Sequence, residues 1–297
     1  MTGSFGRGEA SAYSDLDLFV LGKAEGRPRR EGKRRSKLAR LDEIRLMSDL
    51  ICVTEELEFP PFSGDGRWLV QHSEDDLIKT LGTQHDDVEN TFTARLLLLL
   101  ESRPLLGNST YDKVIETVIS TYWRDYDDHE ADFIPAFLAN DILRLWRTLC
   151  INYEANPGVG SEKEKAKRRV KNYKLKHSRL LTCYSALLYL LHTHKERNTV
   201  SPGDVLDMIR LTPTERLEYL RKQSSLAGAY TALDELLGQY DTFLGTTNRK
   251  EDELIEKFMA RGISKIYMDK ANEFGDSMFG VLNKIGEGSR FYRMFVV

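Results

Sequence analysis

Two aspartates separated by one residue, Asp15 and Asp17, follow a short stretch rich in glycine. Residues two apart on a strand project from the same face, so we expect these carboxylates to lie together. Two close carboxylates repel each other unless a cation lies between them. Their oxygens suit Mg²⁺, which takes further ligands from water and phosphates. The pair therefore predicts a Mg²⁺ site, with Mn²⁺ as the alternative ion, that also receives a phosphorylated substrate.

The stretch before the aspartates is a turn of small residues that contains Gly3, Ser4, Gly6 and Gly8. Such a turn lets backbone N–H groups approach an anion closely. An anion-binding turn followed by a metal-binding pair of aspartates is the minimum equipment for phosphoryl or nucleotidyl transfer. Each feature alone is common, whereas the two together, with ten residues between Ser4 and Asp15, are more specific.

Together they resemble the DNA polymerase β-like nucleotidyltransferase superfamily, in which a Gly-Ser turn precedes a strand with an Asp-x-Asp motif. The sequence of these motifs is most similar to the nucleotidyltransferase domain of bacterial PII-protein uridylyltransferases and their uncharacterised relatives. Their GRGE-type turn is similar to Gly6–Glu9, and their SDxDL strand to Ser14–Leu18. Two further segments, His72–Ser73 and Leu99–Gly107, are similar as well.

The resemblance implies roles for particular residues. Asp15 and Asp17 would hold the metal and carry catalysis, and Gly3, Ser4 and Arg7 would bind the nucleotide. The implied reaction moves a nucleoside monophosphate from an NTP, ATP among them, to an acceptor hydroxyl and releases pyrophosphate. The likeness favours a protein side chain as the acceptor over an RNA 3′ end or a small molecule. The alternative is a catalytically silent nucleotide-binding module, such as one half of a toxin–antitoxin or defence pair.

The helical second half offers further cations for a triphosphate. Lys171 and Lys174 lie three apart on a long basic helix. Because related enzymes often close a helical domain over the nucleotide, the resemblance implies that one or both bind phosphate. A solvated helix face is the alternative. A second candidate face contains Asn140, Arg144 and Thr148, for which internal hydrogen bonding is the alternative.

The fold class expected is α+β: a small mixed-sheet nucleotidyltransferase domain at residues 1–107, followed by an all-α helical bundle domain at 108–297. Strands are predicted at Ser14–Leu21 and Arg67–His72, and a leucine-rich helix at Thr91–Ser102 closes the first domain. The family has a strand before the Gly-Ser turn. Only Met1 and Thr2 precede the turn here, so the first domain is expected either to lack that strand or to be truncated.

Several local signals accompany these elements. Helix starts are predicted at Ser73, Ser201 and Thr212, each of which has an acidic residue three positions later. The dipeptide His85–Asp86 is interpreted as part of a loop. One long helix is predicted to carry an apolar seam at alternating spacings of three and four, a pattern typical of helical bundles: Val170, Tyr173, His177, Leu180, Tyr184, Leu187 and Leu191.

Composition excludes some classes of partner. With 43 Lys+Arg against 46 Asp+Glu, the net charge of −3 gives no overall attraction for DNA. The longest apolar run, Leu96–Leu100, is too short to cross a bilayer, and a cytoplasmic protein is expected.

The basic segment Gly22–Lys37 is either a solvated loop or an arm that contacts substrate. Candidates for a third metal-binding carboxylate are Glu56, Glu58 and Asp65.

Overall fold

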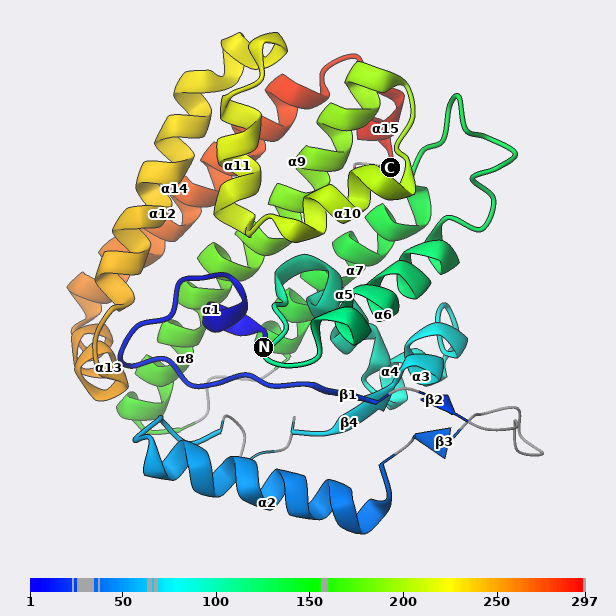
Figure 1. The fold of residues 1–297 in the computed structure, drawn as a ribbon. Helices are drawn as coiled ribbons and strands as arrows, with labels where there is room; N and C mark the ends of the chain where they lie inside the picture. The colour runs from blue at the N-terminus through cyan, green and yellow to red at the C-terminus, as the bar shows by residue number, and fades with distance from the viewer. Residues whose placement is uncertain are drawn as a thin grey trace. The chain divides into compact units, whose positions relative to one another are not determined.

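The computed structural model describes residues 1–22, 24–25, 35–36, 38–62, 66, 69–155 and 160–295, with the backbone alone at 24–25 and 35–36 (Figure 1). The chain forms two compact units, Met1–Arg124 and Asp125–Val297, and each is considered by itself. The division between these units follows the helix at residues 108–122, whereas the predicted domain boundary precedes it. Most of the basic segment Gly22–Lys37 lies outside the described residues.

The first unit combines short strands with helices. Its elements in chain order are α1 (Gly3–Gly6), β1 (Val20–Gly22), β2 (Ala24–Glu25), β3 (Arg35–Ser36), α2 (Arg40–Glu56), β4 (Gln71–Ser73), α3 (Glu74–Lys79), α4 (His85–Val88), α5 (Thr91–Glu101) and α6 (Asn108–Tyr122).

The strands are shorter than the sequence predicts. β1 and β4 pair in parallel, with Val20 opposite Gln71 and Gly22 opposite Ser73, and β2 pairs separately with β3 in antiparallel fashion. The described residues therefore form two separate pairs of strands instead of one mixed sheet. The prediction of a strand from Ser14 is wrong at its start, since the ladder with β4 begins only at Val20. The second predicted strand is displaced toward its C-terminal end, and part of its range lies outside the described residues.

Helix α5 forms the centre of the first unit. Ten of its 11 residues are buried, including every leucine from Leu96 to Leu100. A helix that is apolar on all sides must be surrounded by other elements. Helices α3, α4 and α6 all pack against α5. The leucine-rich segment is therefore the core of this unit, and its C-terminal residue, Glu101, is an acid inside that core.

A buried ion pair lies next to α5. Asp86 and Arg95 form a bidentate pair with N···O distances of 2.9 and 2.5 Å. The hydroxyls of Thr80, Thr91 and Tyr122 complete the network. The interpretation of His85–Asp86 as a loop is wrong: the two residues begin α4, and Asp86 is fully buried. Removing one partner of such a pair would leave an uncompensated buried charge, which is strongly destabilising.

The described residues of the second unit form helices and connecting loops, with no strand among them. Its elements are α7 (Ala136–Glu154), α8 (Glu162–Lys174), the π-helix η1 (Leu175–Arg179), α9 (Leu180–Arg197), α10 (Pro202–Arg210), α11 (Pro213–Arg221), the 3₁₀-helix η2 (Ser224–Ala229), α12 (Tyr230–Thr247), α13 (Glu251–Met259), α14 (Arg261–Gly286) and α15 (Arg290–Arg293).

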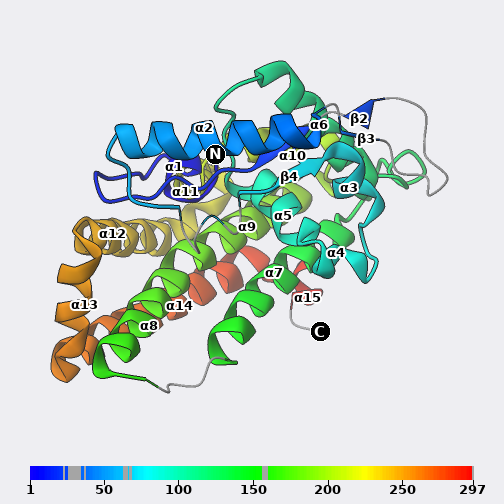
Figure 2. The same ribbon diagram turned by 90° about the horizontal axis from the view of Figure 1, so that it is seen from below.

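Helices α8, η1 and α9 follow one another without a gap and form one long rod through this unit (Figure 2). Helices α7, α10, α11 and α14 pack around α9, and α13 packs against α8. The predicted apolar seam is confirmed, since all of its members except Tyr184 are buried. The capping boxes predicted at Ser201 and Thr212 are confirmed here, as is the one at Ser73 in the first unit. The sequence did not predict the π-helical segment within the rod.

Among the described residues, no helix combines the length and apolar character needed to span a membrane.

Candidate functional site

The glycine-rich turn folds as a closed local structure. Residues Gly3–Gly6 form α1, the N–H of Gly8 donates to Phe5 O over 3.2 Å, and the N–H of Glu9 donates to Ser4 O over 2.8 Å. Gly3 and Gly8 have φ values of 62° and 72°, which glycine adopts without the steric cost that a Cβ brings. Glycine at these two positions is thus required by the shape of the turn itself.

Asp15 and Asp17 lie in the segment that leads into β1. A compact turn precedes them, in which the N–H of Ser14 donates to Ser11 O and the N–H of Ser11 donates to Ser14 Oγ. Both aspartates are half-buried, while Leu18 after them is buried in the core. Both aspartates precede β1, so they lie outside the strand ladder that was expected to align their side chains on one face.

Gly3 and Asp17 are brought into direct contact. The N–H of Thr2 donates to Asp17 O over 2.9 Å, which fixes the start of the turn to the aspartate segment. A Cβ built on Gly3 would overlap the carboxylate of Asp17. The absence of a side chain at position 3 therefore lets the carboxylate lie directly against the turn. This contact joins the two features that the sequence predicted to act together.

Glu101 is the functional candidate that sequence reasoning missed. Its carboxylate is completely buried and accepts the N–H of Gly3 over 3.1 Å and the guanidinium of Arg7 over 2.9 Å. Arg7 also pairs with Glu9 over 2.8 Å. The signal for Glu101 in the sequence is its position directly after the run Leu96–Leu100, because an acid that is buried with such a run must be paired.

These contacts bear on two residues that the resemblance assigned to nucleotide binding. The N–H of Gly3 donates to Glu101 in this structure, and the buried guanidinium of Arg7 is engaged by two carboxylates. Ser4, which lies between Gly3 and Arg7 in the sequence, is half-buried in the turn. Ser4 is therefore the member of this set that remains accessible within the first unit.

The remaining candidates lie on the second unit. Lys171 and Lys174 are both exposed on α8. On α7, Asn140 is exposed, whereas Arg144 and Thr148 are half-buried. Their part in nucleotide binding stays a prediction.

The donor set of the aspartate segment fits a hard cation. Two half-buried carboxylates can supply oxygen ligands, and Mg²⁺ completes its coordination with waters and substrate phosphates. Of the candidates for a third carboxylate, Glu56 and Glu58 are exposed at the end of α2, and Asp65 lies outside the described residues. No group of three or more acidic, histidine or cysteine ligands occurs within the described part of the chain. Held by these two aspartates, Mg²⁺ would take its remaining ligands from water and substrate phosphates.

One comparison with known proteins found a match in this region of the chain. The family model described as a nucleotidyltransferase domain matches residues 1–66, a span that contains the glycine turn and both aspartates. No curated protein and no solved structure matches the chain. The match supports the likeness to the nucleotidyltransferase superfamily, while the likeness to the uridylyltransferases stays a prediction. Residues 1–66 of this chain are similar to a nucleotidyltransferase domain.

Proposed function

We propose that the protein is a metal-dependent nucleotidyltransferase, which moves a nucleoside monophosphate from an NTP to an acceptor hydroxyl and releases pyrophosphate. The observation that carries the proposal is the contact between Gly3 and Asp17, since the turn proposed to bind the phosphates lies against a carboxylate proposed to bind the metal. The family match over the same residues supports it independently.

Each candidate site residue of the first unit has a proposed role. Asp15 and Asp17 would hold Mg²⁺, which on binding neutralises triphosphate charge and stabilises the phosphoryl group in transfer. The hydroxyl of Ser4 would bind the β- and γ-phosphates, since the N–H groups of Gly3, Gly8 and Glu9 already donate within the unit. Gly3 serves by allowing Asp17 to approach, and Arg7 by holding the turn against Glu101.

We propose a protein side chain as the acceptor. This choice rests on the sequence motifs that resemble those of PII-protein uridylyltransferases. An RNA 3′ end or a small molecule would use the same two aspartates, because all three acceptors present a hydroxyl.

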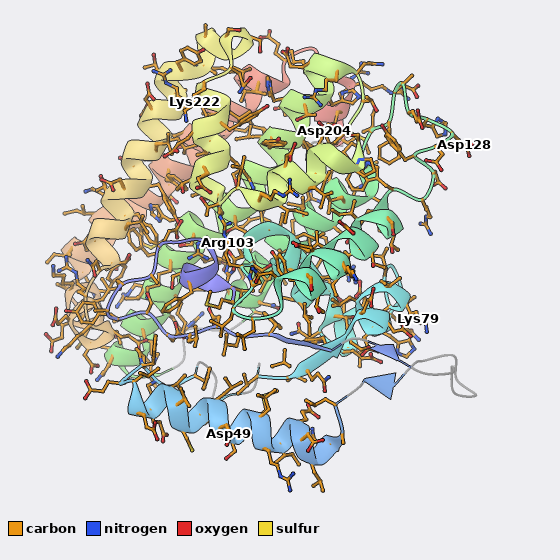
Figure 3. The ribbon with its side chains drawn as sticks, viewed as in Figure 1. Asp49, Lys79, Arg103, Asp128, Asp204 and Lys222 are labelled. Atoms are coloured by element: carbon orange, nitrogen blue, oxygen red, sulfur yellow. The ribbon has the colours of Figure 1, made fainter. Side chains whose placement is uncertain are left out.

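The decisive experiment uses NTPs labelled on the α-phosphorus, each incubated with the purified protein, Mg²⁺ and a cell lysate. The α-label should enter a species that resists RNase and is lost on protease treatment. In a parallel reaction with NTP labelled on the γ-phosphorus, the label should leave as pyrophosphate. The variant Asp15→Asn/Asp17→Asn should abolish transfer and keep its fold. Asp49→Asn, an exposed acid on α2 of the same unit, is the matched control and should transfer normally (Figure 3).

Transfer by the double variant at the native rate would contradict the proposal. Mg²⁺-dependent NTP binding without any transfer would instead identify a catalytically silent nucleotide-binding module. Label in an RNase-sensitive species would replace a protein acceptor by RNA.

A further inference from the structure

Glu101 couples the end of the central helix to the glycine turn. Its carboxylate accepts the Gly3 N–H over 3.1 Å and the Arg7 guanidinium over 2.9 Å, with no exposure of the side chain. A buried carboxylate is tolerated only where charge and hydrogen bonds compensate for lost water. Both compensating groups belong to the turn, at opposite ends of α1.

Two further contacts hold the same surfaces together. A Cβ on Gly6 would overlap the backbone carbonyl of Glu101, so the turn and the end of α5 meet backbone to backbone. Two residues along, Arg103 and Met1 exchange two hydrogen bonds, of 2.7 and 2.9 Å. Arg103 is labelled beside α1 in Figure 3. The end of α5 therefore determines where the turn lies.

The turn in turn determines what lies against Asp17. Gly3, which Glu101 binds through its N–H, is the residue whose Cα faces the Asp17 carboxylate, and Thr2 donates its N–H to Asp17 O. A displacement of the turn relative to α5 would change the separation between the turn and this carboxylate.

We infer that Glu101 is a positioning residue of the proposed nucleotidyl-transfer site: its buried carboxylate, paired with Arg7, holds the Gly3–Arg7 turn against Asp17. The inference rests on the proposed function. Glu101 touches neither substrate nor metal in this assignment, and its effect passes through Gly3 and Arg7.

The test compares Glu101→Gln with Asp86→Asn. Both substitutions keep the shape of a buried acid in the first unit and remove a charge that pairs with an arginine. Asp86 contacts Arg95 and threonines, away from the turn. The two variants should therefore lose thermal stability alike, yet differ in nucleotide binding if Glu101 has the positioning role.

The measurements are Tm by circular dichroism and, well below the Tm of each variant, calorimetric titration with Mg²⁺ and the four NTPs in turn, followed by transfer kinetics with the NTP that the wild type binds. Glu101→Gln should weaken NTP affinity or kcat/KM about 10- to 100-fold, the range typical of lost supporting contacts and small misplacements. Asp86→Asn should leave both within about twofold.

Should Glu101→Gln not fold, Arg7→Lys replaces it, because lysine keeps the charge and loses the two-directional contact with Glu9 and Glu101. An NTP affinity and kcat/KM within twofold of wild type in the folded variant, with a lowered Tm, would overturn the positioning role and leave the proposed function standing. A wild type that neither binds Mg²⁺–NTP nor transfers label would overturn both.

Discussion

Gly3 meets two separate requirements at a single position. Its φ of 62° lies in the left-handed region, and a Cβ there would meet the Asp17 carboxylate. The first requirement concerns only the backbone, whereas the second concerns the residue proposed to hold the metal. The backbone requirement and the need for space beside Asp17 can be separated by comparison with a glycine that has only the backbone requirement.

We predict that Gly3→Ala lowers the transfer rate more than tenfold and destabilises the first unit. The control is Gly107→Ala, where φ is 70° but the nearest atom to a Cβ is Thr110 Cβ at an ordinary 3.9 Å. Left-handed strain alone costs about 1–2 kcal/mol, so Gly107→Ala should lower Tm and leave activity intact. Equal activities of the two variants would show that the contact with Asp17 has no functional weight. Chemical denaturation and label transfer are the two measurements.

At the scale of elements, the helix starts of the second unit are stabilised by local hydrogen bonds. Ser201 Oγ accepts the Asp204 N–H over 3.2 Å, and Asp204 in return accepts the Ser201 N–H over 2.8 Å. Asp204 also pairs with Arg197, which ties α10 to the end of α9 (Figure 3). The capping box therefore acts within its helix and between two neighbouring helices.

Ser201→Ala should lower the free energy of unfolding by about 1 kcal/mol, the usual effect of removing a helix cap. The exposed Ser225 of η2 provides the control, since Ser225→Ala should stay within about 0.5 kcal/mol of wild type. Urea denaturation followed by circular dichroism measures both. A Ser201→Ala protein as stable as the control variant would mean that packing alone determines the start of α10.

The π-helical segment η1 carries a buried histidine. The His177 ring stacks on Phe243 and Phe274 at centroid distances of 4.5 and 4.9 Å, and its Nδ1 lies 2.9 Å from Tyr173 O. Burial among these rings lowers the pKa of His177 to about 4, with Lys176 acting in the same direction and the Tyr173 hydrogen bond opposing it. His177 is therefore neutral in the folded protein near pH 7.

The sign of the resulting pH dependence follows from that shift. The unfolded state, with an ordinary histidine pKa of about 6.5, takes up the proton first, so stability is complete above this value and falls as the pH decreases toward 4. We predict that His177→Phe removes about 2 kcal/mol of the stability loss between pH 7 and 4.5. Ser225→Ala, at an exposed and non-titrating residue of the same unit, should leave the loss unchanged. Denaturant titrations at several pH values would contradict the prediction if both variants retain the wild-type slope.

At the scale of the whole molecule, the second unit has an exposed basic face on α8 that includes Lys171 and Lys174. We predict that Lys171→Met or Lys174→Met weakens NTP affinity about 10- to 100-fold, the effect of losing one charge-assisted bond to phosphate. The Tm should change little, because methionine keeps the apolar stem of an exposed lysine.

The control for this prediction is Lys222→Met, at an exposed lysine that directly follows α11 in the same unit (Figure 3). Calorimetric titration with Mg²⁺ and NTP measures all three variants. Affinities within twofold of wild type for both α8 variants would make this helix a solvated face and direct the search to Arg144 on α7.

The sequence by itself determined the features that act over a few residues. The glycine turn, the three capping boxes and the seam of the long helix are all recognisable because neighbouring residues interact through backbone geometry and helical periodicity. The helical character of the second half follows from the same local rules.

Only the tertiary structure decided the contacts that join distant segments. The strand begins at Val20 and not at Ser14 because a strand extends only as far as its partner pairs with it. Asp86 is buried because Arg95 compensates its charge, and Glu101 reaches Gly3 across 98 positions in the sequence. Local pattern does not encode such pairings, since they arise when burial of the apolar helix α5 brings its terminal acid against the turn.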